Sequence, residues 1–349
     1  MNEQEKANFI NSFSVVIYSL NPRSQDVVTR RFGLKTGNPE TLESIGKRYK
    51  ITRERVRQIE EAALRELRKN FDGFNLGVAV ARVKSILHDR GNVAREDILF
   101  TEFSGSGDYG KANAHLVLLM NISSAFERHP EDNQYFALWT VKDPFYFNRA
   151  KSMIGKMTQG FKKQGAVVGE AELASFFNKS IQEDGVEKNA LLSYASLSKF
   201  ISKNVFGQWG LSAWPEVTPK GIRDKAFLVL RISKKPLHFK EIAGLISGYK
   251  FDSKKANIQT VHNELIKDSR FVLVGRGLYA LSDWGYENGT VKDVMVRILK
   301  KHGILSKEKI VAKTAEARFV KPNTILLNLQ DKKFFRRDEN GFYKLVKEV

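Results

Sequence analysis

The sequence predicts a mainly α-helical protein with small β wings, in which a helix-turn-helix domain precedes tandem winged-helix-like domains. Near the N-terminus, residues 41–68 have the pattern of two amphipathic helices separated by a tight turn. From about residue 75, a pattern of helices followed by two strands recurs four times, with a period of roughly 65 to 70 residues. This period is longer than a solenoid repeat and is about the size of a winged-helix domain.

The first helix of the N-terminal pair is expected to begin after Thr41. Leu42, Ile45 and Tyr49 repeat at three- and four-residue spacing, which gives the helix one apolar stripe. Threonine is a good N-cap, because its hydroxyl can accept a hydrogen bond from a free backbone N–H group. A short turn follows, and the second helix is expected to begin at Thr52.

The second helix has two faces of different chemistry. An apolar stripe, expected to be buried, consists of Val56, Ile59, Ala63 and Leu67. Polar and charged residues near the N-terminus of the helix point away from this stripe: Arg53, Glu54, Arg57 and Gln58. In a helix-turn-helix this end of the second helix enters the major groove of DNA.

These exposed side chains match the chemistry of base edges. Arginine pairs with guanine, glutamate accepts from the cytosine amine and glutamine can pair with adenine, each contact discriminating by about 1–3 kcal/mol. Glu54 favours base reading, because a helix that bound only phosphates would not need it. The alternative is a solvated helix on which Arg57 and Glu61 form an ion pair at i,i+4, worth about 0.2–0.5 kcal/mol.

Four segments of the N-terminal region resemble region 4 of bacterial primary sigma factors: Asn21–Arg23, Arg31–Leu34, Thr41–Gly46 and Thr52–Arg68. The resemblance covers roughly the first fifth of the chain. It implies a module that reads the upstream (minus-35) promoter element and whose first helices dock on the flap of the RNA polymerase β subunit.

The resemblance also implies roles for individual residues. Arg53, Glu54 and Gln58 would contact bases, while Arg57 and the N-cap region of the Thr41 helix would hold the DNA backbone or neighbouring bases. The implied DNA-contacting set in this domain is Thr41, Thr52, Arg53, Glu54, Arg55, Arg57 and Gln58. The implied polymerase-docking set is Ser24, Val27, Val28, Arg31, Phe32 and Leu34.

The likeness to sigma factors is partial. The residues before position 20 leave no room for the sigma regions that melt the start site and bind the polymerase clamp. We therefore expect this chain not to be a complete sigma factor.

The amino-acid composition limits which partners and which kinds of site we expect. The 58 lysines and arginines exceed the 39 acidic residues, for a net charge of +19, which favours a polyanion. The chain has no cysteine, which excludes a disulfide framework and a cysteine-ligated zinc site. The N-terminus lacks the pattern of a signal peptide, and no apolar run has transmembrane length. We expect double-stranded DNA as partner, no membrane association and a cytoplasmic, nucleoid-associated location.

Clusters of glycine and proline divide the sequence into domains. They lie near residues 70–75, 142–145, 215–221 and 285–290. The expected boundaries are 1–72 for the helix-turn-helix domain, and 75–142, 145–215, 220–286 and 289–349 for the winged-helix-like domains.

The last two repeats align without gaps over their second halves, at a constant offset of 64 positions. Six identities fall in register: Thr260 with Thr324, Leu265 with Leu329, Phe271 with Phe335, Gly277 with Gly341, Tyr279 with Tyr343 and Leu281 with Leu345. The pattern predicts a third helix with Thr and Leu on its core side, then a hairpin wing with a glycine in its turn. The first two repeats are more divergent.

The third repeat resembles a named module. Pro236–Ala243, Thr260–Val261 and Phe271–Gly285 are similar to the HARE-HTH domain, a winged helix that occurs in the delta subunit of bacterial RNA polymerase and in chromatin and restriction proteins. The likeness is fainter in the fourth repeat. The delta subunit has a long acidic tail, whereas this chain ends on the basic segment Lys344–Val349, which counts against a displacing role like that of delta.

Basic residues of the third repeat are candidates for phosphate contacts from helix and wing, namely Lys254, Lys255 and Arg276, together with Lys267 and Arg270. Winged helices also serve as protein-docking modules, in which case these side chains would only be solvated. The sequence leaves both alternatives open.

No pattern in the sequence indicates an enzyme, a metal site or a cofactor. None of the six histidines is spaced for paired metal ligation on one helix face, and Gly275-Arg276-Gly277 lacks the third glycine of a dinucleotide fingerprint. Asp252-Ser253-Lys254 matches half of a nuclease site, but it lacks a strand context and an acidic partner, and it is expected to cap the third helix of its repeat.

We therefore expect a sequence-specific DNA-binding transcription factor that acts with bacterial RNA polymerase, its winged helices adding contacts to DNA or polymerase. Two alternatives remain. One is an interaction protein whose winged helices bind polymerase or another factor. The other is a free-standing repressor that competes with sigma factors and contacts no polymerase.

Overall fold

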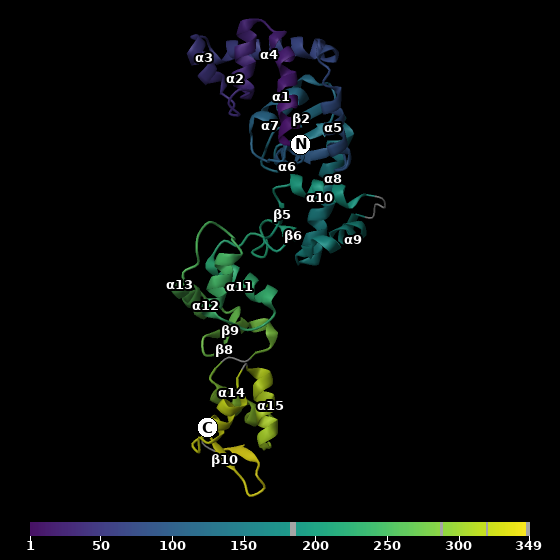
Figure 1. The fold of residues 1–349 in the computed structure, drawn as a ribbon. Helices are drawn as coiled ribbons and strands as arrows, with labels where there is room; N and C mark the ends of the chain where they lie inside the picture. The colour runs from purple at the N-terminus through teal and green to yellow at the C-terminus, as the bar shows by residue number, and fades with distance from the viewer. Residues whose placement is uncertain (182–185, 287–288, 319, 347–349) are drawn as a thin grey trace. The chain divides into compact units, whose positions relative to one another are not determined.

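The computed structural model describes residues 1–181, 186–286, 289–318 and 320–346. The predicted fold class is confirmed: helices dominate the described residues, and the strands form small antiparallel sheets (Figure 1). None of the described helices combines the length and the apolar character that crossing a membrane requires.

The chain forms two compact units. The N-terminal unit comprises residues 1–203 with 207–213, and the C-terminal unit comprises residues 204–206 with 214–349.

The N-terminal unit begins with a bundle of helices, each started by a polar residue. Asn2, Asn21, Thr41 and Thr52 are the N-caps, and the side chain of each accepts a hydrogen bond from a backbone N–H of its helix. The elements are α1 (Glu3–Tyr18), α2 (Pro22–Phe32), α3 (Leu42–Tyr49), α4 (Arg53–Lys69) and the short 3-10 helix η1 (Phe71–Phe74).

Two winged-helix repeats complete this unit, and both follow the order helix, strand, helix, helix, strand, strand. The first contains α5 (Gly77–His88), β1 (Val93–Arg95), α6 (Glu96–Ser104), α7 (Lys111–Ile122), β2 (Phe126–His129) and β3 (Leu138–Val141). The second contains α8 (Pro144–Gln164), β4 (Val168–Gly169), α9 (Glu170–Ile181), α10 (Lys188–Leu197), β5 (Ile201–Lys203) and β6 (Gln208–Leu211).

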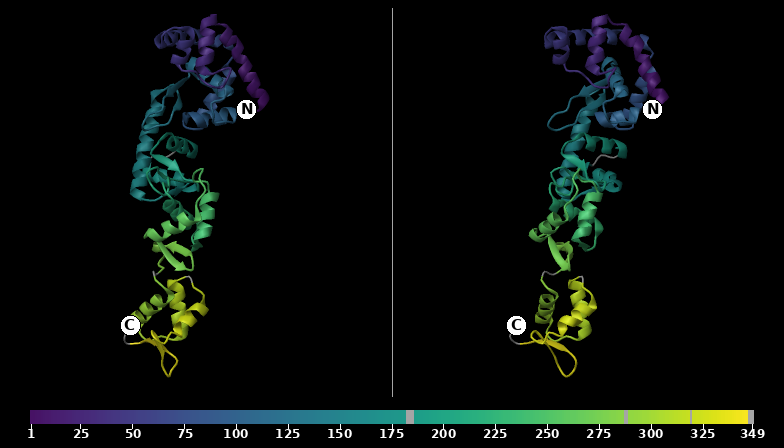
Figure 2. Two further views of the ribbon diagram at one scale, coloured as in Figure 1. Left: turned by 90° about the vertical axis from the view of Figure 1, so that its left-hand side faces the viewer. Right: turned by 60° about the vertical axis from the view of Figure 1, so that its left-hand side comes forward.

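The C-terminal unit carries the other two repeats (Figure 2, green and yellow). The third contains α11 (Ile222–Ser233), β7 (Leu237–His238), α12 (Phe239–Gly248), α13 (Ile258–Lys267), β8 (Phe271–Gly275), β9 (Leu278–Leu281) and η2 (Ser282–Trp284). The fourth contains α14 (Val291–His302), α15 (Lys307–Ala317), α16 (Pro322–Leu329), β10 (Phe335–Arg337) and β11 (Tyr343–Leu345).

The sheets contain a strand that the periodicity did not predict. In the first three repeats a strand of two or three residues pairs with the last strand of the hairpin, giving the orders β1-β3-β2, β4-β6-β5 and β7-β9-β8. In the fourth repeat a single antiparallel bridge between Leu305 and Tyr343 takes its place. A segment of two or three residues is too short to show an alternating pattern.

The hairpin register confirms the 64-residue offset between the third and fourth repeats. Phe271 pairs with Leu281 in one, and Phe335 pairs with Leu345 in the other. The turn glycines Gly277 and Gly341 both have positive φ angles, of 70° and 86°.

One part of that expectation is wrong. Thr260 and Thr324 are exposed, so they do not lie on the core side of their helices. The neighbouring Val261 and Ile325 are buried there instead. The sequence pattern alone does not show which of two neighbouring residues, a threonine or an apolar β-branched residue, faces the core. In the structure the apolar side chain is the buried one.

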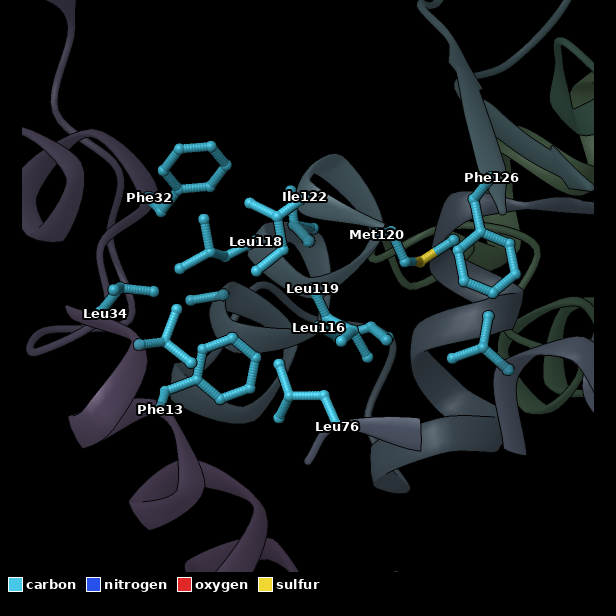
Figure 3. Close-up of a cluster of buried hydrophobic side chains, with 14 of the residues drawn as sticks. Phe13, Phe32, Leu34, Leu76, Leu116, Leu118, Leu119, Met120, Ile122 and Phe126 are labelled. Carbon is cyan, nitrogen blue, oxygen red and sulfur yellow. The ribbon is translucent and has the colours of Figure 1, made fainter. Parts of the chain in front are cut away.

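The helix-turn-helix region shares its core with the first winged-helix repeat. Phe13 of α1, Phe32 of α2 and Leu67 of α4 belong to one buried cluster with Leu118 of α7 and Trp139 of β3. Figure 3 shows Leu116, Leu118 and Leu119 of α7 in the middle of this cluster, with Phe13, Phe32 and Leu34 on one side and Phe126 on the other. The apolar core is therefore continuous across residues 70–75.

Candidate nucleic-acid interface

The α3–turn–α4 segment is tightly built. Lys50 caps α3 in the left-handed region at φ 53°, and the Ile51 N–H donates a hydrogen bond of 3.0 Å to the Gly46 carbonyl. A Cβ added to Gly46 would lie 2.8 Å from the Ile51 carbonyl oxygen, closer than real Cβ contacts. Gly46 therefore allows α3 to pack closely against the turn.

A small core holds α3 and α4 together, as the apolar stripes predicted. Ile45 of α3, Val56 of α4 and Val27 of α2 are fully buried. Partly buried apolar side chains surround them, namely Leu42, Tyr49, Ile51 and Ile59. The exposed face of α4 is thereby fixed in orientation.

The five candidate side chains in the first two turns of α4 are all exposed: Arg53, Glu54, Arg55, Arg57 and Gln58. Thr41 and Thr52 are also exposed, but their hydroxyls cap the two helices, accepting hydrogen bonds from the backbone N–H groups of Ser44 (3.1 Å) and Arg55 (3.2 Å). The structure thus brings the predicted base-reading set together on one face.

The ion pairs on this face are unequal. Arg57 contacts Glu54 at 2.6 Å and also contacts Glu61, so the pair that the solvated-helix alternative requires does form. The hydrogen bond from Arg57 holds the pKa of Glu54 below its usual range. Arg55 donates a hydrogen bond of 3.0 Å to the Gln58 side chain. Arg53 has no ion-pair partner among the described residues, which leaves its guanidinium free for a ligand.

A charged network that was not predicted from the sequence anchors α2 to α3. Arg30 contacts Asp26 at 2.6 Å and Glu40 at 2.9 Å, and the Tyr49 hydroxyl donates a hydrogen bond of 2.5 Å to Asp26. Partial burial alone would raise the pKa of Asp26, but the hydrogen bonds from Arg30 and Tyr49 outweigh it and lower that pKa. The i,i+4 spacing of Asp26 and Arg30 was the available sequence signal.

The polymerase-docking set proves to be mostly core, which corrects the expectation that its side chains face a partner. Five of its members are buried: Ser24, Val27, Val28, Phe32 and Leu34. The sixth, Arg31, is half-buried and donates hydrogen bonds to the Glu60 carboxylate (3.3 Å) and the Glu40 carbonyl (3.2 Å).

The burial has a structural cause. Val27 belongs to the helix-turn-helix core, whereas Val28, Phe32 and Leu34 belong to the cluster built around α7. Helix α2 therefore has two apolar faces, and the second is covered by the chain's own first winged-helix repeat. Sequence pattern cannot distinguish an apolar face that awaits a partner from one that a later segment covers.

Polar contacts reinforce this covering. The Tyr109 hydroxyl donates a hydrogen bond of 3.2 Å to the Phe32 carbonyl, and Arg68 of α4 donates one of 2.9 Å to the Asn121 carbonyl of α7. His115 of α7 packs edge-on against Phe13, and burial lowers its pKa. Helix α7 thus packs against α1, α2 and α4.

The third helices of the first two repeats are internal. Nine of the twelve residues of α7 are buried, and α10 is largely buried. In α10, Ser193 donates a hydrogen bond of 2.7 Å to the Val93 carbonyl of the preceding repeat. Neither helix presents a free face of the kind that enters a groove. By contrast, Gln259 and Asn263 on α13 are exposed.

The third-repeat candidates Lys254, Lys255 and Arg276 are exposed. Both lysines lie in the loop before α13, and the arginine lies in the β8–β9 turn. None of the three has an acidic partner within 4 Å in the described part of the chain. Arg270 differs, since it contacts Asp268 at 2.7 Å and Asp224 at 3.0 Å.

Asp252 does not cap α13 as expected, because Asn257 occupies the N-cap. The Asp252 carboxylate instead contacts Lys225 and accepts a hydrogen bond of 3.0 Å from the Lys254 N–H. These contacts lower the pKa of Asp252, and the hydrogen bond from Lys225 has the largest effect. The described residues contain no group of three or more side chains suited to hold a metal ion.

Comparison with known proteins identifies two segments. Residues 16–69 match the family model "Sigma-70, region 4". Residues 222–284 match the HARE-HTH family model, whose description ends "restriction endonuclease HTH domain". Both resemblances proposed from the sequence are thereby confirmed, and the region 4 segment is a DNA-binding helix-turn-helix related to sigma factors.

Curated relatives of the region 4 segment are RNA polymerase sigma factors. Over 53 residues, 15% of this chain, it is 55% identical to SigA of Nostoc sp., 51% to SigA of Clostridium acetobutylicum and 53% to SigA1 of Synechococcus elongatus. The match covers 14%, 14% and 13% of these relatives, so this chain spans about a seventh of their length.

Proposed function

We propose that the chain is a transcription factor that reads a promoter element of the minus-35 type through α4. The single observation that carries the proposal is the exposed set at the start of α4, where Arg53 has no ion-pair partner among the described residues and stands beside Glu54 and Gln58. Supporting it, the segment that holds these residues is half identical to sigma factors. Arginine, glutamate and glutamine are side chains that distinguish bases in the major groove.

In this proposal the first winged-helix repeat acts as a rigid support for the reading helix. Its helix α7 packs on α1, α2 and α4 through one continuous core. A reading helix that is already held in place by such packing loses less conformational entropy when it binds, which favours affinity.

The proposal includes action on transcription initiation by bacterial RNA polymerase. The sigma factor relatives are named for that enzyme. Because α7 covers the second apolar face of α2, a polymerase contact would have to use other, exposed surfaces. The same covering favours a second candidate function, a free-standing regulator that occupies the element and blocks sigma factors without binding polymerase.

Two assays on the full chain test the proposal. Selection of bound duplexes from a randomised pool should enrich one short motif, and a pool that stays random would exclude base reading. Size-exclusion chromatography with purified core polymerase then separates the two candidates. Co-elution at near-physiological salt supports an accessory factor, whereas separate elution of a chain that still selects a motif supports the free-standing regulator.

A further inference from the structure

The β10–β11 hairpin of the fourth repeat has an unusual pair of side chains. Arg336 and Lys344 are direct partners across the two antiparallel strands, and both are exposed. Direct partners lie on the same face of a hairpin, with Cβ atoms about 4.5–5.5 Å apart, and like charges at such positions are destabilising. The protein therefore carries two like charges at directly opposed positions on an exposed surface.

The equivalent hairpin of the third repeat lacks this repulsion. The positions 64 residues earlier are Val272 and Ala280, which are partners in the same register. Both are buried, under a partly buried apolar cover that includes Trp284. The two repeats thus share one backbone arrangement but differ at this face, which is apolar and covered in one and doubly basic and open in the other.

The charge on this face is not neutralised by its surroundings. Neither Arg336 nor Lys344 has an acidic partner within 4 Å among the described residues, and the same holds for the exposed Lys332 and Lys333 just before β10. Of the acidic residues at the hairpin tip, Asp338 is engaged within the turn, where its carboxylate accepts hydrogen bonds from the backbone N–H groups of Asn340 and Phe342.

The distribution of charge along the chain points the same way. Residues 289–349 contain 15 lysines and arginines against seven acidic residues, a net charge of +8. Residues 75–142, of similar length and fold, contain seven against eight, a net charge of −1. The repeat that supports α4 is thus nearly neutral, and the fourth repeat is strongly basic.

We propose that the open face of the β10–β11 hairpin, built on Arg336 and Lys344, is a binding site for the phosphate backbone of duplex DNA. The repulsion between two adjacent cations falls when an anionic backbone lies across them. The choice of duplex DNA among polyanions rests on the proposed function of α4, since a chain held at a promoter keeps its other basic surfaces at high effective concentration near the same duplex.

The site would add affinity without reading sequence. Contacts to phosphate oxygens position a protein on DNA and carry no sequence information directly. Each phosphate neutralised contributes about 0.9 to the slope of log K against log salt concentration on B-form DNA. Loss of both cations should therefore make that slope shallower by about 1.8.

The test uses the full chain, fluorescence anisotropy and two labelled duplexes, one with a minus-35-type element and one with that element scrambled. Arg336→Gln with Lys344→Gln should weaken binding to both duplexes by the same factor and flatten both salt slopes by about two. The matched control is Lys84→Gln with Lys162→Gln, which removes two exposed charges from the first two repeats. The control should keep the parent slope.

A second variant separates binding from folding. Arg336→Glu places a carboxylate opposite Lys344, which converts the repulsion into a cross-strand ion pair. Its Tm should equal or exceed that of the parent while duplex binding falls. A lower Tm with parent-like binding would overturn the proposal.

Three further outcomes would overturn it: a parent-like salt slope in the double glutamine variant, equal flattening in the control, or loss of binding to single-stranded RNA while duplex binding is kept. The result is independent of base reading. If the parent does not discriminate between the two duplexes, the proposed function fails, yet a flattened slope on both still supports the hairpin site.

Discussion

Tyr109 donates a hydrogen bond of 3.2 Å to the backbone carbonyl of Phe32, joining the segment before α7 to the end of α2 across 77 positions of sequence. Around this bond, α7 and the helix-turn-helix region share one apolar core. The helix-turn-helix region and the first winged-helix repeat therefore form one structural body in this protein.

This shared core predicts that a cavity made in α7 also destabilises the helix-turn-helix region. Leu118 is fully buried in the cluster, so Leu118→Ala should lower the free energy of unfolding by about 2–5 kcal/mol. Hydrogen exchange should show the amides of α2 and α7 losing protection together. Val78→Ala on α5, where the side chain is 86% exposed, is the control and should change stability by less than about 0.5 kcal/mol. Loss of protection in α7 alone would show that the two parts fold independently.

The close approach at Gly46 predicts the sign of a glycine substitution. Gly46→Ala should destabilise the protein by about 1–3 kcal/mol, because the new methyl group would overlap the Ile51 carbonyl and force the backbone to move. Gly155→Ala on α8 is the matched control, since nothing lies within 4 Å of its added Cβ. That change should stabilise the protein by about 0.5–1 kcal/mol through helix propensity. Thermal unfolding followed by circular dichroism measures both, and a stabilising Gly46→Ala would refute the steric account of the turn.

The exposed face of α4 predicts position-specific losses. Arg53→Ala and Gln58→Ala should each cost about 1–3 kcal/mol on the selected duplex, relax preference at one base position and change little on random DNA. Lys69→Ala, at the exposed far end of the same helix, should leave base preference unchanged. Binding isotherms on single-position variants of the duplex are the measurement. Equal loss on selected and random DNA would mean that these residues contact phosphates only.

The Asp26 network predicts acid sensitivity. The folded protein holds the pKa of Asp26 below that of the unfolded chain, so the unfolded chain takes up the proton first as the pH falls. The stabilisation is therefore complete above the ordinary aspartate pKa of about 4 and is lost as the pH falls below it. Asp26→Asn should shrink the acid-induced loss in urea unfolding experiments. Asp72→Asn, an exposed aspartate without an ion pair in the described structure, should preserve it. Equal acid sensitivity in parent and Asp26→Asn would contradict the assignment.

Local signals sufficed for the helices and wings. The caps Thr41 and Thr52 located α3 and α4, and the 64-residue offset predicted the pairing of Phe335 with Leu345. These features depend on residues close in sequence, where periodicity and capping chemistry act directly.

Packing between segments that are far apart in the chain could not be predicted from the sequence. Nothing local in Val28, Phe32 or Leu34 indicates that α7, more than 75 residues away, covers them. Helices α7 and α10 are likewise apolar on most of their surface, which marks burial but not the neighbour. The pairing of Arg336 with Lys344 could have been predicted from the sequence, because the 64-residue offset aligns these residues with Val272 and Ala280.

The most direct test of the central claim, that α4 reads sequence, is the ratio of affinities of the full chain for a minus-35-type duplex and for a scrambled duplex of equal length, at near-physiological salt. We predict a ratio of about 10³ or more, as for specific DNA-binding proteins, and a fall of that ratio in Arg53→Ala. Equal affinity for the two duplexes, with a steep salt dependence on both, would contradict the claim and leave a protein that binds DNA through its charge alone.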